Sequence, residues 1–337
     1  MIRVFTSGAR DCSSNGEVVL LPLKAKVYNE DNGDFYLSLD CPIKYADYVK
    51  DDNIIVAPTP QGEQPFRIIT RTVSNRKIEV RANHVYYDSM NFLIADSYVQ
   101  NKNGDGAIKW LNNATMPTSY FTVSSNVSTV DSYRCVRTSL KEAFDVLIER
   151  WGGHLKRDKW NVQLLSSIGV DNGINIEYRK NLEEIKATYD YSEVVTKLMP
   201  EGKDGVLLDD LYITADVQYD IPYCKTVSFE QDIESEDYPT EEAYILALKA
   251  DLRKQAAAYI NKYKYPMVTY ELKAQPEKVT DIGDVIFVRD KEIGIELLTN
   301  VISYEYDAIT ERYTSLEFGN YRKTVKGAIM GLIKKAM

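Results

Sequence analysis

Two histidines are the first residues in this sequence that could carry out acid–base chemistry. His84 follows the strand-like segment 78–82, and His154 follows the end of a predicted helix. Neither lies near a G-x-S-x-G nucleophile motif or within an H-E-x-x-H zinc motif. The sequence therefore predicts a structural or surface role for both, although a Ser-His-Asp or Cys-His pair assembled from distant residues stays open.

Carboxylates are abundant, with 50 Asp and Glu residues, so an adjacent pair such as Asp209 and Asp210 says little about catalysis. A glycosidase needs two carboxylates about 5–10 Å apart across a cleft, which a linear sequence does not specify. The acidic segment 29–34 suggests a calcium loop but lacks the D-x-[DN]-x-[DN]-G-x5-E spacing. We interpret it as a hairpin turn in which Gly33 can take a positive φ. The loop 200–205 lacks the phosphate-binding spacing G-x-x-x-x-G-K-[ST] and is interpreted as a turn.

The remaining reactive or ligand-stacking side chains also favour structural roles. Cys12, Cys41, Cys135 and Cys224 are scattered, without C-x-x-C spacing, which is typical of free thiols in a reducing cytoplasm. The tryptophans could stack on sugars, but Trp151 lies on the apolar stripe of a predicted helix, where core packing is the default. We therefore predict no catalytic, cofactor-binding or metal-binding residues.

Length and charge narrow the class of protein. A chain of 337 residues is long enough for two or three domains. The net charge of −9 argues against sequence-specific recognition of nucleic acid, which requires a basic surface. Nothing resembles a signal peptide or an 18-residue apolar run, so we expect no membrane span and a soluble protein made in the cytoplasm.

Short strands dominate both ends of the sequence. Phe35, Leu37 and Leu39 alternate with Tyr36, Ser38 and Asp40, and Val285 and Phe287 near the C-terminus recur at the same period of two, which marks a half-buried strand. Between them, 154–156 with 162–165 and 169–178 around the turn 171–173 are predicted as two hairpins.

Helices are predicted in the middle of the chain and at its end. A helix over 140–151 has Ser139 as its N-cap and Glu142 completing a capping box. A longer helix over 241–262 begins after Thr240 and stops before Pro266. A short amphipathic helix is predicted near the C-terminus, over 325–335.

Six segments, in their order and spacing, resemble the prophage tail proteins of long-tailed phages, which form the tail-tip hub or the N-terminal region of a tail-associated lysin. That family is similar to the central hub of contractile-tail baseplates. The segments are Asn32-Gly33-Asp34-Phe35-Tyr36-Leu37-Ser38-Leu39, His84-Val85-Tyr86-Tyr87-Asp88, Leu198-Met199-Pro200-Glu201-Gly202-Lys203-Asp204-Gly205, Tyr265-Pro266-Met267-Val268-Thr269-Tyr270, Asp281-Ile282-Gly283-Asp284-Val285 and Leu316-Glu317-Phe318-Gly319-Asn320.

The resemblance implies a multidomain α+β protein that is mainly β, with two small β-barrels and α+β insertions, like a baseplate hub. In the family, the two barrels of each subunit alternate around the axis, so that a homotrimeric ring can dock onto a six-fold partner. The implied division is a first barrel over 1–95, an α+β domain over 96–184, a second barrel from 185–210 plus 266–325, a helix-containing insertion over 211–265, and a C-terminal helix over 326–337.

The implied function is that of a structural virion protein at the tail tip. Its implied partners are two further copies of itself, the distal tail protein ring or tail tube, the tape-measure protein, and receptor-binding or fibre proteins. Because the sequence stops shortly after Asn320, where the family often carries a hydrolase or fibre module, no enzymatic activity is carried over. The alternatives are a tail-associated peptidoglycan-degrading endopeptidase or glycosidase, and a carbohydrate-binding module that uses exposed Tyr and Trp.

Overall fold

A computed structural model describes residues 1–319, apart from residues 51, 178–179, 181, 232, 275, 277–279 and 291–294. The chain divides into two compact units. The first combines Met1–Lys186 with Glu271–Gly319, and the described part of the second is Ala187–Tyr270. The helix predicted over 326–337 lies outside the described residues. The five-part domain division stays a prediction.

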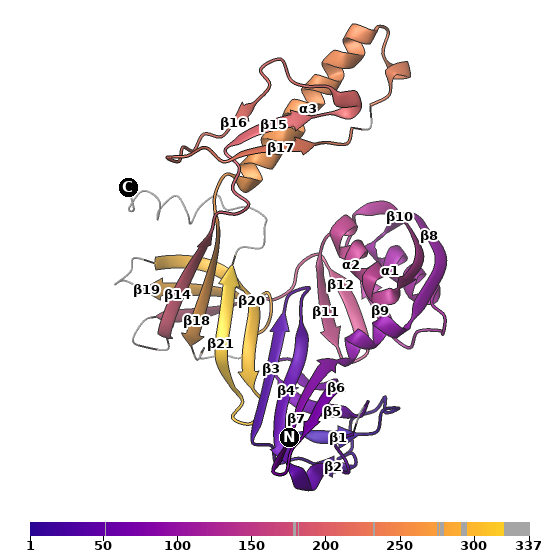
Figure 1. Ribbon diagram of the computed structural model, residues 1–337, viewed down its shortest axis with the longest axis vertical. Helices are drawn as coiled ribbons and strands as arrows, with labels where there is room; N and C mark the ends of the chain where they lie inside the picture. The colour runs from indigo at the N-terminus through magenta and orange to yellow at the C-terminus, as the bar shows by residue number, and fades with distance from the viewer. Residues whose placement is uncertain are drawn as a thin grey trace. The chain divides into compact units, whose positions relative to one another are not determined.

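One large sheet of 13 strands, drawn from both ends of the chain, organises the first unit (Figure 1). Within it, neighbouring strands are hydrogen-bonded in the order β14-β18-β21-β20-β3-β4-β7-β6-β5-β1-β2. Outside this order, β19 pairs with β20 and with β13. The strands are β1 (Arg3–Phe5), β2 (Val18–Val19), β3 (Lys24–Glu30), β4 (Phe35–Pro42), β5 (Ile54–Thr59), β6 (Gly62–Val73), β7 (Lys77–His84), β13 (Asp171–Glu177), β14 (Leu182–Asp190), β18 (Met267–Ala274), β19 (Val285–Asp290), β20 (Ile295–Asp307) and β21 (Arg312–Gly319).

The two halves of this sheet meet where β3 pairs antiparallel with β20. Tyr304 lies opposite Asn29, and its hydroxyl accepts a hydrogen bond from the Asn29 amide at 3.3 Å. The two separate barrels predicted from sequence are not confirmed, because the strand order among the described residues branches at β20 and does not close on itself. Alternating burial is the same in an open sheet and in a closed barrel, so the sequence pattern could not distinguish them.

A smaller α+β part is inserted in the sequence between β7 and β13. Its two-stranded sheet pairs β8 with β10, and its three-stranded sheet has the order β11-β12-β9. Helix α2 has the predicted capping box at Ser139 and Glu142, and it ends at Gly152, whose φ is +75°. The elements are β8 (Leu93–Asn103), α1 (Gly104–Asn113), β9 (Thr122–Ser125), β10 (Val130–Ser139), α2 (Leu140–Trp151), β11 (His154–Asp158) and β12 (Asn161–Leu165).

One predicted hairpin is confirmed and the other is wrong. Strands β11 and β12 pair antiparallel as expected. The segment 169–178 does not fold back on itself, because β13 is a single strand that pairs in parallel with β19. Its register shifts between Asp171 and Ile174, so the turn residues form an irregularity inside the strand instead of a hairpin turn.

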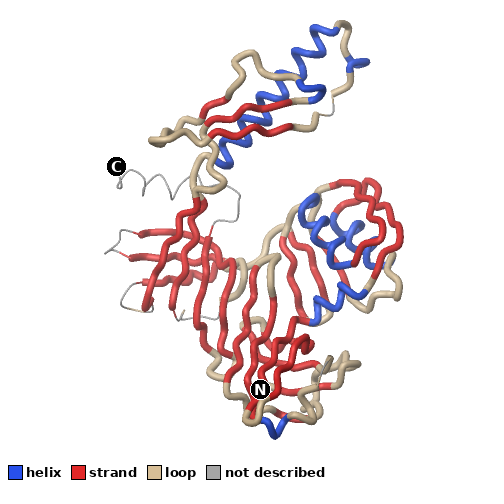
Figure 2. The backbone as a smooth tube through the Cα atoms, viewed as in Figure 1, coloured by secondary structure: helices blue, strands red, loops and turns tan. Residues whose placement is uncertain are grey.

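The second unit packs one long helix against a small sheet (Figure 2). Helix α3 (Glu241–Tyr263) begins where the Thr240 hydroxyl accepts the N–H of Ala243 at 3.2 Å, as predicted. Its buried residues Leu248, Leu252, Ala256 and Ile260 recur at the helical period. The strands, in the order β16-β15-β17, are β15 (Lys197–Glu201), β16 (Ile213–Thr214) and β17 (Cys224–Ser228).

Four short 3-10 turns complete the elements of the described chain: η1 (Ile43–Tyr45), η2 (Val85–Asn91), η3 (Lys203–Gly205) and η4 (Ser235–Asp237). No helix in the described ranges is both long and apolar enough to cross a membrane. The predicted class, α+β with mainly β-structure, is confirmed.

Candidate functional site

His84 ends β7 and is fully buried. Its Nδ1 accepts the N–H of Tyr86 at 3.2 Å, which assigns the proton to Nε2, 3.2 Å from the amide oxygen of Gln64. The ring stacks on Phe35 with centroids 4.4 Å apart. Burial, helped by the positive charge of Arg157, lowers the pKa of His84 well below its usual range. A neutral, buried imidazole with both nitrogens paired is a structural residue.

His84 is expected to make the folded chain acid-sensitive. The unfolded chain binds a proton at this histidine below about pH 6.5, whereas the folded chain does not until its lowered pKa is reached. Stability is therefore complete above about pH 6.5 and falls as the pH decreases, by up to about 1.4 kcal/mol per pH unit. Urea unfolding between about pH 7.5 and pH 5 checks this, because in this range His84 binds a proton only in the unfolded chain. His84→Phe should flatten the slope relative to wild type, and an unchanged slope would contradict the assignment.

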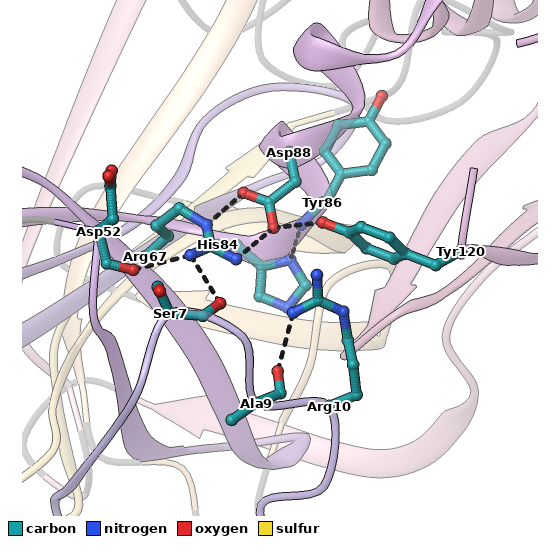
Figure 3. Close-up of polar contacts among 9 residues, drawn as sticks. All are labelled: Ser7, Ala9, Arg10, Asp52, Arg67, His84, Tyr86, Asp88 and Tyr120. Carbon is teal, nitrogen blue, oxygen red and sulfur yellow. Dashed lines mark hydrogen bonds and ion pairs between the residues drawn. The ribbon is translucent and has the colours of Figure 1, made fainter. Parts of the chain in front are cut away.

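An ion pair between Arg67 and Asp88 is the centre of the network in Figure 3. Arg67 Nε and one terminal nitrogen donate to the two oxygens of Asp88 at 2.6 and 2.8 Å. Its other terminal nitrogen donates to the backbone oxygens of Asp52 and Ser7 at 2.7 and 3.1 Å. The Tyr120 hydroxyl also donates to Asp88, at 2.7 Å. This network therefore holds together five segments of the first unit.

The surroundings of Tyr120 favour a fixed, structural network. Burial, followed by its hydrogen bond to Asp88, raises the pKa of Tyr120. The Arg10 guanidinium lies 4.0 Å from the centre of the Tyr120 ring. Because both Asp88 oxygens accept hydrogen bonds from nearby donors, this carboxylate is poorly suited to act as a general base. Sequence reasoning missed the network, since its members are scattered without a local motif.

The acidic turn between β3 and β4 is held by β11 of the inserted α+β part. Arg157, which is 5% exposed, donates to the backbone oxygens of Gly33 and Glu30 at 2.5 and 2.6 Å. It also donates to the side-chain oxygen of Asn29 at 2.9 Å. The Tyr87 hydroxyl adds a bond to the Gly33 oxygen at 2.9 Å. The predicted hairpin is confirmed, and its backbone carbonyl oxygens accept hydrogen bonds from a buried arginine.

His154 lies at the same turn. Its Nδ1 is 2.7 Å from one carboxylate oxygen of Asp31. Beside it, the Asn32 side chain accepts the N–H of Leu155 at 2.7 Å and donates to the oxygen of Gly153 at 3.1 Å. The structure thus brings His154, but not His84, against an acidic side chain.

The segment Asp281-Ile282-Gly283-Asp284 forms a tight crossing with the connection that follows β12. Gly169 and Gly283 have φ values of +77° and +88°, and a Cβ on either would collide with backbone atoms of the other segment. Asp284 accepts the N–H groups of Val170 and Asp281 at 2.8 and 2.9 Å. These residues therefore form a structural crossing, which explains the glycine between two aspartates.

Asp281 is the titratable group most affected by this crossing. Its carboxylate accepts the Gln61 amide N–H at 3.0 Å and the Ile282 N–H at 2.7 Å. Burial raises the pKa of Asp281 to about 6, because its effect is larger than the opposite effect of these two hydrogen bonds. A cavity of about 280 Å³ opens beside it, between the β3–β4 turn, the β5–β6 turn and β11.

The tryptophans have different surroundings. Trp151 is 2% exposed and its indole N–H donates to the oxygen of Lys102 at 2.8 Å, so the predicted core packing is confirmed. Trp110 is 46% exposed, and its indole N–H donates to the Ser97 hydroxyl at 3.1 Å. Trp160 packs partly buried against two apolar clusters. The three rings thus contact the protein in three different ways.

The other sequence candidates have structural partners. Asp209 and Asp210 pair with Lys249 and Arg253 of α3. In the loop 200–205, which forms the predicted turn, Lys203 contacts Glu234 at 3.0 Å. The four cysteines are free thiols, as predicted. Among the described residues, no three His, Cys, Asp or Glu side chains are grouped so that they could hold a metal ion.

The sequence and the structure are both similar to those of phage tail proteins. Residues 170–329 match the prophage endopeptidase tail family. The structure is similar to that of prophage tail protein gp18 from Listeria monocytogenes EGD-e, with a TM-score of 0.62 and 14% identity over 99% of this chain and 98% of that one. It is also similar to the 43 kDa tail protein of prophage MuSo2 from Shewanella oneidensis, with a TM-score of 0.64 and 11% identity over 94% and 97%.

A third similar structure is the E. coli c3393 protein, described as a type VI secretion system component with structural similarity to the T4 bacteriophage tail proteins gp27 and gp5. Its TM-score is 0.51, with 9% identity over 94% of this chain and 75% of that one. No curated protein matches the sequence. The predicted resemblance to prophage tail proteins is confirmed, and at these identities the structural likeness establishes the fold.

Proposed function

We propose that this chain is a structural component of a phage or prophage tail tip. In this proposal, three copies form a hub that closes the tail tube and connects it to the parts that attach to the host. The observation that carries it is the likeness to two prophage tail proteins over 94–99% of the chain. The protein is made in the bacterial cytoplasm and acts in the virion.

The arrangement of polar residues supports a static role. The Arg67–Asp88 pair and the Arg157 contacts each join segments that are distant in sequence, and both arginines direct their terminal nitrogens at protein oxygens. A subunit that transmits load in an assembly needs such fixed joints between its layers. The proposed partners are the distal tail ring or tail tube, the tape-measure protein and the receptor-binding or fibre proteins.

Trimer formation is tested by native mass spectrometry and light scattering over a range of protein concentrations. We expect a species of three times the 38.5 kDa protomer mass, alone or after addition of a hexameric tail-tube or distal-tail ring. Tube protein kept in its monomeric form is the matched control, because it offers no six-fold surface. A chain that stays monomeric alone and beside the assembled ring would refute the proposed hub.

The alternative is a tail-associated enzyme that degrades peptidoglycan, and the family's description as an endopeptidase tail favours it. The partly buried contact between His154 and Asp31, at 2.7 Å, is the pair that such an activity would use first. Release of soluble fragments from dye-labelled peptidoglycan distinguishes the two functions. We expect no release above buffer, whereas release that His154→Ala abolishes would replace the structural assignment.

A further inference from the structure

The cavity beside Asp281 is lined by parts of the first unit that are far apart in sequence. Asn29 and Glu30 end β3, and Asp31 opens the β3–β4 turn. Gln61 belongs to the β5–β6 turn, and Asp281, Ile282 and Asp284 belong to the glycine crossing. Its volume of about 280 Å³ is far larger than a single water molecule requires. Four carboxylates and two basic side chains line it, so its formal charge is negative.

Two buried oxygen atoms at this cavity have no hydrogen-bond partner in the protein. They are Oδ1 of Asp31 and Oε1 of Gln61. The Asp31 side chain is only 8% exposed, and its other oxygen is occupied by His154. The Gln61 amide nitrogen is committed to Asp281, so its oxygen cannot exchange places with it. A buried acceptor without a donor lowers the free energy of unfolding by about 1–3 kcal/mol. A cation or a hydrogen-bond donor bound at these two oxygens would remove this penalty.

Neighbouring basic groups do not supply that ligand. Arg157 directs its terminal nitrogens at carbonyl oxygens of the β3–β4 turn, and Lys156 is exposed. Asp284 has both oxygens engaged by backbone N–H groups. Asp281 uses one oxygen for both of its hydrogen bonds, which leaves the second oxygen as an acceptor. The available atoms at the cavity are therefore oxygens from Asp31, Gln61 and Asp281.

We propose that this cavity binds a calcium ion through Asp31, Gln61 and Asp281. Oxygen-only ligands select a hard cation, and Ca²⁺ accepts irregular geometry and amide oxygens, whereas Mg²⁺ demands a near-ideal octahedron. Two carboxylates and one amide take part, so the amide oxygen of Gln61 stands where a third carboxylate or histidine would, and no such group of three is present among the described residues. Water completes the coordination, and the affinity falls in the weak class of about 10⁻⁴–10⁻³ M.

Calcium bound here would join three turns of the first unit. The β3–β4 turn, the β5–β6 turn and the glycine crossing meet at the ion, and each contributes one ligand. Binding to the folded chain alone raises its stability in proportion to the logarithm of ligand concentration. The ion would therefore raise the melting temperature of the first unit, and this effect does not depend on trimer formation.

The test uses the full chain after removal of metals with a chelator. Calcium is titrated to about 10 mM, followed by isothermal titration calorimetry and by the melting temperature from tryptophan fluorescence, with magnesium in a parallel titration. We expect one saturable site for calcium and a weaker response to magnesium. No saturable response to calcium, or an equal response to both ions, would overturn the proposal.

Three variants locate the site. Asp31→Asn and Gln61→Leu should each weaken calcium binding by about tenfold or more. Asp34→Asn is the matched control, because it removes an acidic side chain of the same turn that is 66% exposed and does not line the cavity. If Asp31→Asn does not fold, Gln61→Leu alone decides. Wild-type affinity in every folded cavity variant, or an equal loss in Asp34→Asn, would show that calcium binds elsewhere and contradict the proposal.

Discussion

Replacing Gly283 with alanine is expected to unfold the first unit, or to lower its free energy of unfolding by more than about 3 kcal/mol. A Cβ at this position would lie 2.5 Å from the oxygen of Ile168 and 2.7 Å from its carbonyl carbon. Real Cβ contacts do not approach so closely, and the obstacle is backbone that is itself held by the Gly169 crossing. A φ of +88° adds strain for any residue with a Cβ.

Gly62→Ala separates the two contributions. Gly62 has a similar φ of +93°, but no atom lies within 4 Å of its Cβ position, so only the backbone strain of about 1–2 kcal/mol is expected. Urea unfolding followed by tryptophan fluorescence measures both variants in the first unit, because all three tryptophans lie there. Equal losses in the two variants would mean that the crossing is looser than described.

Replacing Arg157 with alanine is expected to cost about 3 kcal/mol of unfolding free energy. The guanidinium makes three charge-assisted bonds at 2.5–2.9 Å to the β3–β4 turn, and its removal leaves the buried oxygen of Asn29 without that donor. It also removes the cation 5.3 Å from the Phe35 ring. We expect the turn to become accessible to hydrogen exchange before the rest of the large sheet.

Arg134→Ala is the matched control for that substitution. Arg134 makes a bidentate pair with Asp96, at 3.1 and 2.7 Å, but the two side chains are 63% and 53% exposed. Surface pairs of this kind contribute about 0–1 kcal/mol, so the change should be small. Chemical denaturation of both variants in one buffer checks the contrast. A loss for Arg134→Ala as large as that for Arg157→Ala would show that burial is not the cause.

Local patterns were enough to predict two of the helices, α2 and α3. Ser139 and Glu142 predicted the start of α2, and Thr240 predicted the start of α3, because a capping interaction involves residues only three positions apart. The β3–β4 hairpin was predicted from the alternation of Phe35, Leu37 and Leu39 with polar residues. Each of these elements depends on neighbours in sequence.

Pairings between distant segments could not be predicted in the same way. The residues 171–173 look like a hairpin turn, yet β13 finds its partner in β19, more than 100 positions later, and the turn residues become an irregularity in its register. The two barrels are not confirmed for a related reason, since period-two burial does not specify which strand lies beside which. Arg67, Asp88, Tyr120 and Arg157 carry no sequence signal, because nothing local distinguishes a buried arginine from an exposed one.

The pairing of β3 with β20 also sets the order in which the chain can fold while it is being synthesised. Asn29 and Tyr304, which meet across this pair, are 275 positions apart. The large sheet therefore stays incomplete, with one edge of β3 unpaired, until almost the whole described chain has left the ribosome. Within the described residues, the second unit is the single segment Ala187–Tyr270, so this part is synthesised before β20.

An unpaired strand edge attracts other strands, including those of neighbouring nascent chains. Chaperone protection of residues 1–186 during synthesis would keep the edge of β3 free for β20. The edge of β3 is therefore covered only once the last 49 residues of the first unit, Glu271–Gly319, have been synthesised.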